Sequence, residues 1–427
     1  MEDNARRSRR DLIQNIAIVA LSLSAVLLFA QSQIYNLISG QDPLGDQFSG
    51  SASVDATLQQ TPLTAPVRVA VTGAYTRYGA CLTTDAESFS DLGLLLKESL
   101  GSAGSLTACR GRDFLTALNS TSVYYDFLSP LPLSILAKLV GGDSAADSVS
   151  ARHLVLSVGS GAVSLYTWDG EDDFRFCQVP PVSADDMTAI ASNCTFGAAA
   201  FAMDQKDPTY SRIAPYSLLL EEQPDLPVLS AANPLSSTDQ VLTSLGFNPS
   251  TKNRYTDSGG TEIIREADRS LQIEPDGTVI YQSSGVSLGI SAADDVPTLS
   301  EAVDGCTALL RRLLGDQSGE AALYLEAVSQ AGETTVLRFG YHADGVPIYF
   351  SDGGAAAEVT LAGVSVTELS LRFRQYTDSG ETSLLLPLRP TTSVAERRDL
   401  AKFPEFSVQS LADGSYTSSV SAQWLAE

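Results

Sequence analysis

Apolar and polar positions alternate with a period of two along several stretches of the chain, and this alternation predicts β-strands. The first stretch contains Val67, Val69 and Val71, each separated from the next by one residue. Residues 152–179 hold three runs of the same kind, interrupted by a Gly-Ser-Gly turn and an Asp-Gly turn, and predict a β-meander. Strand–turn–strand patterns recur at 254–284 and 319–390. Antiparallel sheet is therefore the expected main structure.

Two stretches instead repeat apolar residues at helical spacing. One covers residues 89–100, and the clearer one follows Thr298, which forms a capping-box pattern with Glu301 and precedes a stop at Gly315. The apolar positions of this second helix fall on one face: Leu299, Ala302, Val303, Cys306, Leu309, Leu310 and Leu313. Cys306 is accordingly predicted to be a buried core thiol.

The segment GYHADGVPIYFSDGG, residues 340–354, gathers a histidine, two aspartates, a serine and several glycines. Such a list is compatible with a metal site or a phosphate loop. Asp344-Gly345 between two strand-like runs is a strong hairpin signal, and the following SDGG is a second turn. We interpret the segment as part of the structural scaffold rather than as a metal site or a phosphate loop.

The order of elements predicts an α+β fold, in which an N-terminal transmembrane helix precedes two or three extracytoplasmic domains of antiparallel sheet with packed helices. The predicted parts are a cytoplasmic tail (1–11), the transmembrane helix (12–30), a linker (31–63), an N-terminal α+β domain (64–232), a central helix-plus-sheet domain (233–330) and a C-terminal sheet domain (331–427).

The predicted transmembrane helix is a run of nineteen mostly apolar residues, 12–30, without charge. At 1.5 Å per residue it spans roughly 28 Å, about one hydrocarbon core. It follows four arginines, Arg6, Arg7, Arg9 and Arg10. This asymmetry predicts a cytoplasmic N-terminus and an extracytoplasmic body at the cell membrane.

Two other interpretations of the N-terminus stay open. A cleaved signal peptide would have Ala30 before the cut, but Leu28 at the −3 position is larger than such sites prefer. SRRDLI, residues 8–13, resembles a twin-arginine export signal, although no cofactor motif follows it. An uncleaved anchor is the favoured interpretation.

Small and polar residues within the span allow a second transmembrane helix to approach and hydrogen-bond. The candidate partner-helix contacts are Gln14, Asn15, Ala17, Ala20 and Ser24. The alternative is that these residues have no such role, since isolated small residues are common in any single-pass anchor.

The net charge of −24 argues against nucleic acid as a partner, because its phosphates would be repelled. In an oxidising exterior the cysteines allow two short-range disulfides, Cys81–Cys109 and Cys177–Cys194. No Cys-x-x-Cys pair occurs, so the sequence predicts no zinc site.

Signals of catalysis are weak throughout the chain. Its two histidines, His153 and His342, have no metal-ligand spacing, and no nucleophile elbow, phosphate loop or dinucleotide fingerprint occurs. The acidic cluster at 169–173 is interpreted as a solvated hairpin tip. We predict no catalytic residues, no cofactor and no metal.

Several short motifs nevertheless resemble a known family. PVRVAVTG (66–73), VYYDFLSPLPLSILAKL (123–139), LQIEPDGTVIYQ (271–282) and LRFGYHADGVPIYF (337–350) follow the anchor in an order similar to that of the YycH proteins of Gram-positive bacteria, and the second half is similar to their sister YycI. The repeated sheet unit also resembles PepSY-type folds.

The resemblance implies a membrane-anchored regulator of a two-component system. Proteins of this family contact a sensor histidine kinase that governs cell-wall metabolism, partly through their transmembrane helices, and catalyse nothing themselves. The implied partners are a sensor histidine kinase and a YycI-like sister protein. Two rival classes remain: a membrane-tethered binding or inhibitory module for peptide or cell-envelope ligands, and an anchored enzyme of unrecognised type.

Overall fold

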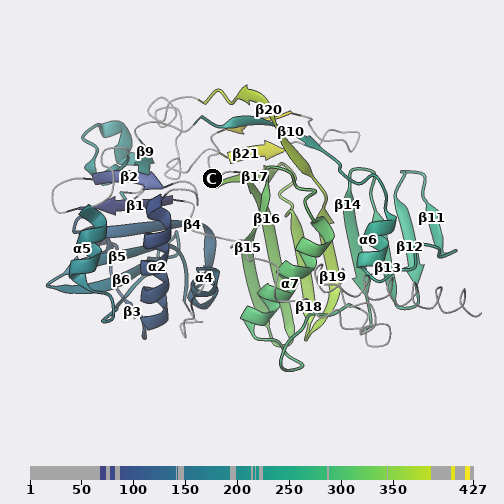
Figure 1. Cartoon of the computed structure of the whole chain (residues 1–427), viewed down its shortest axis with the longest axis horizontal. Coiled ribbons are helices and arrows are strands. Elements are labelled where there is room, and N and C mark those ends of the chain that lie inside the picture. Colours follow the sequence, from purple (N-terminus) through teal and green to yellow (C-terminus); the bar gives the residue numbers. More distant parts are fainter. Residues whose placement is uncertain are drawn as a thin grey trace, which may run out of the picture. The chain divides into compact units, whose positions relative to one another are not determined.

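A computed structural model describes residues 68–73, 77–81, 87–140, 142, 149–192, 199–212, 215–216, 218–220, 225–285, 288–343, 345–385, 405–408 and 419–423. These residues all belong to one compact unit, Gln60–Glu427. Its secondary structure is antiparallel sheet with a few helices, as the alternation of apolar positions predicts (Figure 1). The predicted transmembrane helix and its five candidate contact residues lie outside the described residues.

A seven-stranded antiparallel sheet, here called the first sheet, is built from the N-terminal half. Its spatial order is β2-β1-β4-β5-β6-β7-β3. The strands are β1 (Arg68–Thr72), β2 (Arg77–Cys81), β3 (Thr107–Ala108), β4 (Ser122–Pro132), β5 (Ser150–Gly159), β6 (Ala162–Trp168) and β7 (Phe174–Gln178). The predicted meander is confirmed as β5–β6–β7, with a two-residue turn at Ser160-Gly161 in which both residues have positive φ.

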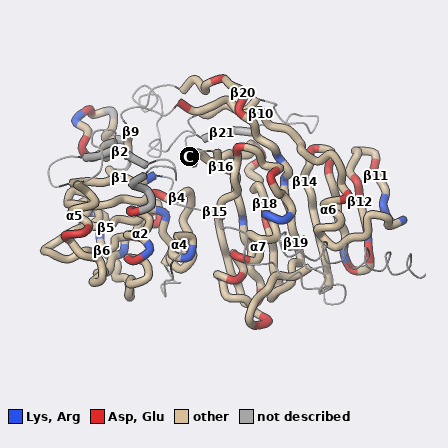
Figure 2. The backbone as a smooth tube through the Cα atoms, viewed as in Figure 1, with Lys and Arg blue, Asp and Glu red and all other residues tan. Residues whose placement is uncertain are grey.

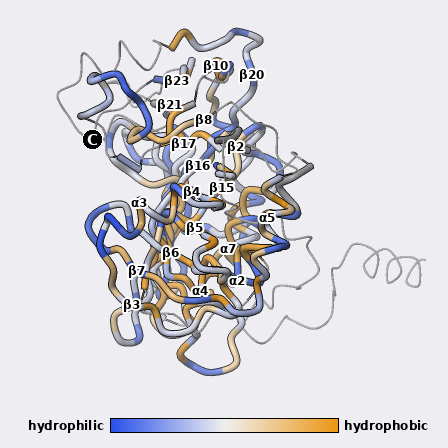
Figure 3. Tube along the Cα trace, turned by 90° about the vertical axis from the view of Figure 1, so that its left-hand side faces the viewer, coloured by the Kyte–Doolittle hydropathy of each residue, from blue (hydrophilic) through white to orange (hydrophobic). Residues whose placement is uncertain are grey.

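Alternate residues of these strands enter two separate cores. Val69, Val71 and Tyr125 face a core that includes helices α2 (Glu87–Ser102), α4 (Leu133–Leu139) and α5 (Ala184–Ser192). The next residues along, Ala70 and Tyr124, face a second core with α3 (Gly111–Leu118) and the strands β8 (Ala199–Phe201) and β9 (Leu218–Leu220). Figure 3 shows α3 on one side of the strands and α2 and α5 on the other. Successive side chains point to opposite faces of a strand, and both faces of the first sheet are covered.

The second sheet has eleven strands and carries the C-terminal half. Its path is β11-β12-β13-β14-β19-β18-β16-β17-β21-β23, and β15 pairs with β16. Its strands are β11 (Arg254–Thr256), β12 (Glu262–Glu266), β13 (Arg269–Ile273), β14 (Thr278–Ser283), β15 (Ala322–Ala331), β16 (Thr334–Ala343), β17 (Val346–Phe350), β18 (Ala357–Ala362), β19 (Ser365–Arg372), β21 (Glu405–Val408) and β23 (Ala422–Gln423).

Helix α7 (Leu299–Leu314) packs on this sheet against β16 and β18. The predicted capping box is confirmed, because Thr298 Oγ1 accepts from the Glu301 amide at 3.3 Å and Glu301 Oε2 accepts from the Thr298 amide at 2.8 Å. Cys306 is fully buried, and burial raises the pKa of its thiol to about 12. The predicted core face and the stop at Gly315 are likewise observed. A short helix, α6 (Asp239–Ser244), packs beside α7.

Two of the expected domain boundaries are wrong. The boundary at 330/331 cuts the hairpin of β15 and β16, whose strands pair from Ala331↔Thr334 onward, so central and C-terminal regions share one sheet. Residues 227–232 were expected in the N-terminal domain. They form β10 (Pro227–Ala232), which instead pairs with β20 (Gln375–Thr382) and β22 (Ser419–Val420) in a three-stranded sheet.

The expected Cys81–Cys109 disulfide is corrected, because Cys109 carries a free thiol, as does Cys177. Cys81 ends β2 at one edge of the first sheet, whereas Cys109 follows β3 at the opposite edge. Six strand spacings separate these edges, roughly 29 Å along the sheet, while bonded cysteines need Cα atoms within about 7 Å. The expected Cys177–Cys194 pair depends on Cys194, which lies outside the described residues.

We expect iodoacetamide to modify Cys109 about 100-fold faster than Cys306 in the native protein, since only exposed thiolate reacts. Cys109 is partly exposed, whereas Cys306 is buried with a strongly raised pKa. Peptide mass spectrometry after timed labelling gives both rates, and labelling in urea serves as the control that makes them equal. Equal rates in the native state, or a disulfide at Cys109, would contradict the structure.

Candidate functional site

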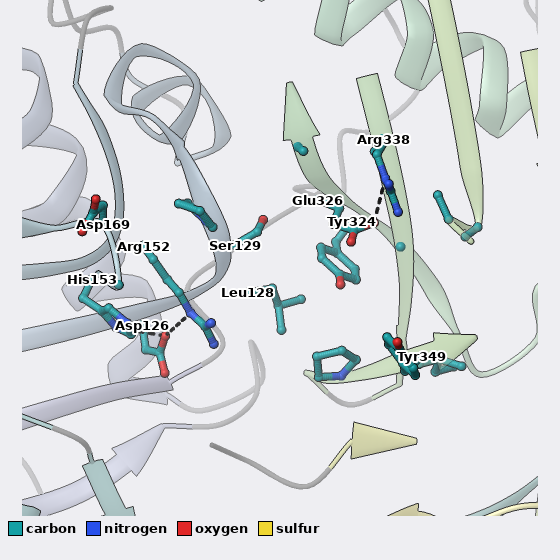
Figure 4. Close-up of a pocket in the computed structure, with 18 of the residues that line it drawn as sticks. Asp126, Leu128, Ser129, Arg152, His153, Asp169, Tyr324, Glu326, Arg338 and Tyr349 are labelled. Atoms are coloured by element: carbon teal, nitrogen blue, oxygen red, sulfur yellow. Dashed lines mark ion pairs between the residues drawn. The ribbon is translucent and has the colours of Figure 1, made fainter. Parts of the chain in front are cut away.

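A cleft of about 580 Å³ opens between the first sheet and the second sheet (Figure 4). One wall comes from β4, β5 and the end of β6, and the other from β15, β16, β17 and the turn after β17. Sites for small ligands usually have volumes of about 300–1,000 Å³. The cleft is therefore large enough to hold a small molecule or a few residues of peptide.

A large bulge in β4 brings the two walls together. Asp126 pairs with His153 and Leu131 pairs with Ala151, so four residues of β4, 127–130, lie opposite one residue of β5. The bulge carries Ser129 to the second sheet, where its hydroxyl donates to the Leu325 carbonyl oxygen at 2.9 Å. Outside the cleft, Lys138 of α4 forms an ion pair with Asp304 of α7.

The wall on the first sheet holds a buried charge network around Asp126. Its Oδ2 lies 2.7 Å from Nη2 of Arg68, and both side chains are more than nine-tenths buried. Its Oδ1 lies 3.5 Å from Nε of Arg152 and 3.2 Å from Nδ1 of His153, without hydrogen-bond geometry to any group in the described part of the chain. Burial alone would raise the pKa of Asp126, but the two guanidinium groups and His153 outweigh it and hold the pKa well below its usual range. Asp126 is thus a charged anchor rather than a proton acceptor at neutral pH.

His153 lies next to two aromatic rings in the same wall, both nearly parallel to it. Its ring centroid lies 4.3 Å from that of Trp168 and 5.7 Å from that of Tyr124, with interplanar angles of 19° and 14°. The Tyr124 hydroxyl lies 2.8 Å from Nδ1. Burial lowers the pKa of His153 and outweighs the opposite effect of Asp126, so the imidazole is neutral at pH 7.

This lowered pKa predicts a loss of stability in mild acid. Unfolded chains take up the histidine proton near pH 6.5, and the folded protein does so only at lower pH. Stability is therefore complete above about pH 6.5 and declines as the pH falls through the folded pKa. The charged and titratable groups that face His153 are Asp126, Arg68, Arg152 and Tyr124. The contribution of Asp126 to stability is lost only below its own unfolded pKa of 3.8.

Urea unfolding midpoints between about pH 7 and pH 5 measure this effect. We expect the midpoint to fall across the window in the wild-type protein and to vary much less in His153→Gln. His342→Gln is the matched control and should keep the wild-type decline. A wild-type midpoint that stays flat across the window would contradict the assignment.

The opposite wall carries aromatic and charged side chains of the second sheet. Tyr324 lies over Gly340, where a Cβ atom would overlap its ring, and Glu326 lies 3.7 Å from Nε of Arg338. Arg338 also donates to the carbonyl oxygen of Gly353 at 3.4 Å. Tyr349 of β17 is 46% exposed and borders the cleft. This wall therefore offers both a carboxylate and aromatic surface.

Residues 340–354 form the predicted hairpin and also line the cleft. The hairpin is confirmed, with Ala343 paired to Val346 across a two-residue loop and Gly345 at φ 76°. Seven of its residues nevertheless line the cleft: Gly340, Pro347, Ile348, Tyr349, Phe350, Gly353 and Gly354. His342 is half-buried, and its Nδ1 accepts from the Gly345 amide at 3.3 Å.

Asp126 is not among the functional candidates that the sequence pattern indicates. The signal was a charged residue inside the apolar strand VYYDFL, where a carboxylate must be paired if it is buried. The predicted acidic tip is a hairpin turn, in which Asp169 Oδ1 accepts from the amides of Glu171 at 2.8 Å and Asp173 at 3.2 Å. Figure 2 shows charged residues of both signs spread over both sheets.

Within the described ranges, no three His, Cys, Asp or Glu side chains are grouped so that they could hold a metal ion. In the same ranges, no helix is both long enough and apolar enough to span a bilayer. No family model matches the chain, and no curated protein or solved structure matches it.

Proposed function

We propose that this chain is a non-catalytic, single-pass membrane protein that regulates a sensor histidine kinase, and that the cleft is its recognition site outside the cytoplasm. The observation that carries the proposal is where the family-like motifs lie. VYYDFLSPLPLSILAKL forms β4 and α4, and LRFGYHADGVPIYF forms β16 and β17. These segments are about 200 residues apart in the chain, yet they supply facing walls of one cleft. A shared recognition surface explains why both occur in one chain.

In this mechanism the helix at 12–30 contacts transmembrane helices of the kinase. The kinase exists in two arrangements, and a partner shifts their populations only if it binds one of them more tightly. Small and polar residues such as Ala20 and Ser24 allow close helix packing, so they supply the differential contact. The body adds a second contact surface, on the kinase or on a YycI-like sister protein, and its acidic charge keeps it away from anionic lipid.

Replacing residues 12–30 with an unrelated transmembrane helix tests this mechanism. We expect kinase output, measured with a reporter in the native cell, to change as it does when the whole gene is deleted, because the body alone cannot bias the kinase helices. The matched control is an unrelated helix into which Gln14, Asn15, Ala17, Ala20 and Ser24 are restored at their positions; it should recover regulation. Full regulation by the unrelated helix would rule out helix–helix signalling.

A second candidate is a membrane-tethered binding module that uses the helix only as an anchor. The charged and aromatic walls of the cleft favour it, since they suit a ligand independently of any kinase. An anchored enzyme is less favoured, because the buried carboxylate of Asp126 is held ionised between two guanidinium groups. Retained function with the unrelated helix would support the tethered module.

A further inference from the structure

We propose that the cleft binds a short peptide that has a free amino group and a free carboxylate, the amino group toward Glu326 and the carboxylate toward Arg152. This inference rests on the proposed function in one respect, namely that the cleft is a recognition site. Binding to the purified protein does not require the kinase, so the two proposals fail separately.

Side chains of opposite charge lie on the two facing walls of the cleft. Arg152 extends from β5 toward the middle of the cleft, with Nε donating to the Phe127 carbonyl oxygen at 3.1 Å and its side chain 18% exposed. Glu326 extends from β15 on the other side and is 38% exposed. A ligand with separated charges of both signs is complementary to this arrangement.

Charged groups of both signs in the cleft make a ligand with a single charge less complementary to it. A phosphate beside Arg152 would face the carboxylate of Glu326 on the other wall. An isolated cation would meet Arg152 and Arg338 in the same way. A ligand with both charges can place its amino group at Glu326 and its carboxylate at Arg152, and so uses the attractive group on each wall.

The surface between the charged groups is suited to peptide side chains. Leu128 of the β4 bulge, Pro347 and Tyr349 supply apolar and aromatic area in the cleft. The volume of about 580 Å³ lies well within the range for small-ligand sites. These features favour small apolar side chains between the two charged ends.

Strand β15 supplies a second observation that points to a peptide. Among the described strands it forms ladder hydrogen bonds with β16 alone, and the β4 bulge reaches it only at Leu325, whose carbonyl oxygen accepts from Ser129. Glu326 and Ala327 of this strand line the cleft. An extended peptide can add to the edge of a strand by main-chain hydrogen bonds, which sugars and lipids cannot reproduce.

Tryptophan fluorescence of the purified full-length protein provides the test. Trp168 lines the cleft, and the other tryptophan, Trp424, is removed in a W424F background. The probe is tetra-alanine with free ends, compared with its N-acetylated and its C-amidated forms. We expect saturable binding of the free form and affinity at least about tenfold weaker for each blocked form.

Glu326→Gln assigns the amino end. The variant should weaken binding of free tetra-alanine about tenfold without further weakening the N-acetylated form, because both changes remove the same charge pair. Glu333→Gln, at the far turn of the β15–β16 hairpin, is the matched control and should bind like the wild type.

Three outcomes would overturn the proposal. One is the absence of binding up to about 10 mM, both for tetra-alanine and for a mixture of unblocked tripeptides. Another is equal affinity for free and blocked forms. The third is an unchanged affinity in Glu326→Gln. Peptide binding without any effect of the protein on kinase output would leave this inference standing and contradict the proposed function instead.

Discussion

Replacing Asp126 with asparagine should lower the free energy of unfolding by about 3–5 kcal/mol, because it leaves a buried guanidinium without its counter-charge. Arg68 is 7% exposed and has its carboxylate partner at 2.7 Å. Arg152 loses a nearby negative charge as well. Urea unfolding at neutral pH, followed by circular dichroism, measures the change.

Two variants control for this prediction. Asp173→Asn removes a carboxylate that is 43% exposed and pairs with Arg175, so it should change stability by less than about 1 kcal/mol. The double variant Arg68→Met, Asp126→Leu removes both charges and should recover most of the loss. An Asp126→Asn variant as stable as the Asp173→Asn control would mean that the buried network contributes little.

Gly319→Ala should be the second severe change, with a loss of about 3–5 kcal/mol from a left-handed backbone and a steric overlap together. Gly319 has φ 64°, and a Cβ atom there would overlap the carbonyl oxygen of Tyr376. That oxygen accepts from the Glu320 amide at 2.8 Å, and Ser318 accepts from the Tyr376 amide at 3.0 Å. The methyl group would therefore separate β20 from the loop before β15.

Gly332→Ala is a matched control for the steric part. Gly332 has nearly the same φ, 63°, but a Cβ atom there would have no heavy atom within 4 Å. It should lose only the backbone contribution of about 1–2 kcal/mol. Thermal unfolding of both variants gives the comparison, and equal losses would show that the contact with Tyr376 does not restrict the site.

Local features were predictable from sequence because their signals lie within a few residues. The capping box of Thr298 and Glu301, the apolar face of α7 and the two-residue hairpin at Asp344-Gly345 depend on spacing alone. Each was placed correctly without knowledge of the fold.

Features that depend on distant strands were not predictable in the same way. Pairing Cys81 with Cys109 assumed that a short loop brings its ends together, but β2 and β3 lie at opposite edges of the first sheet. The boundary expected at 330/331 lies inside the β15–β16 hairpin, because the order of elements does not show which strands pair. The pair of Arg68 and Asp126 depends on the register of β1 against β4, which no local pattern encodes.

The cleft, too, could not be predicted from sequence, because it depends on distant strands. Its walls come from β4 and from β15 to β17, and they meet because a bulge directs Ser129 to Leu325. Residues 340–354 are chemically rich, and the strand around Asp126 is part of a family-like motif. No local pattern in either segment indicates that the two face each other.

Photo-crosslinking in membranes of the native cell tests the central claim most directly. A benzophenone amino acid replaces Ala20 in the predicted helix, Tyr349 in the cleft or, as control, Tyr255 on β11, which is exposed to nearly the same extent as Tyr349, 48% against 46%. We predict that Ala20 captures a sensor histidine kinase, identified by mass spectrometry, and that Tyr349 gives a crosslinked product that Tyr255 does not. Failure to capture a sensor kinase from Ala20, together with identical products from Tyr349 and Tyr255, would contradict the account.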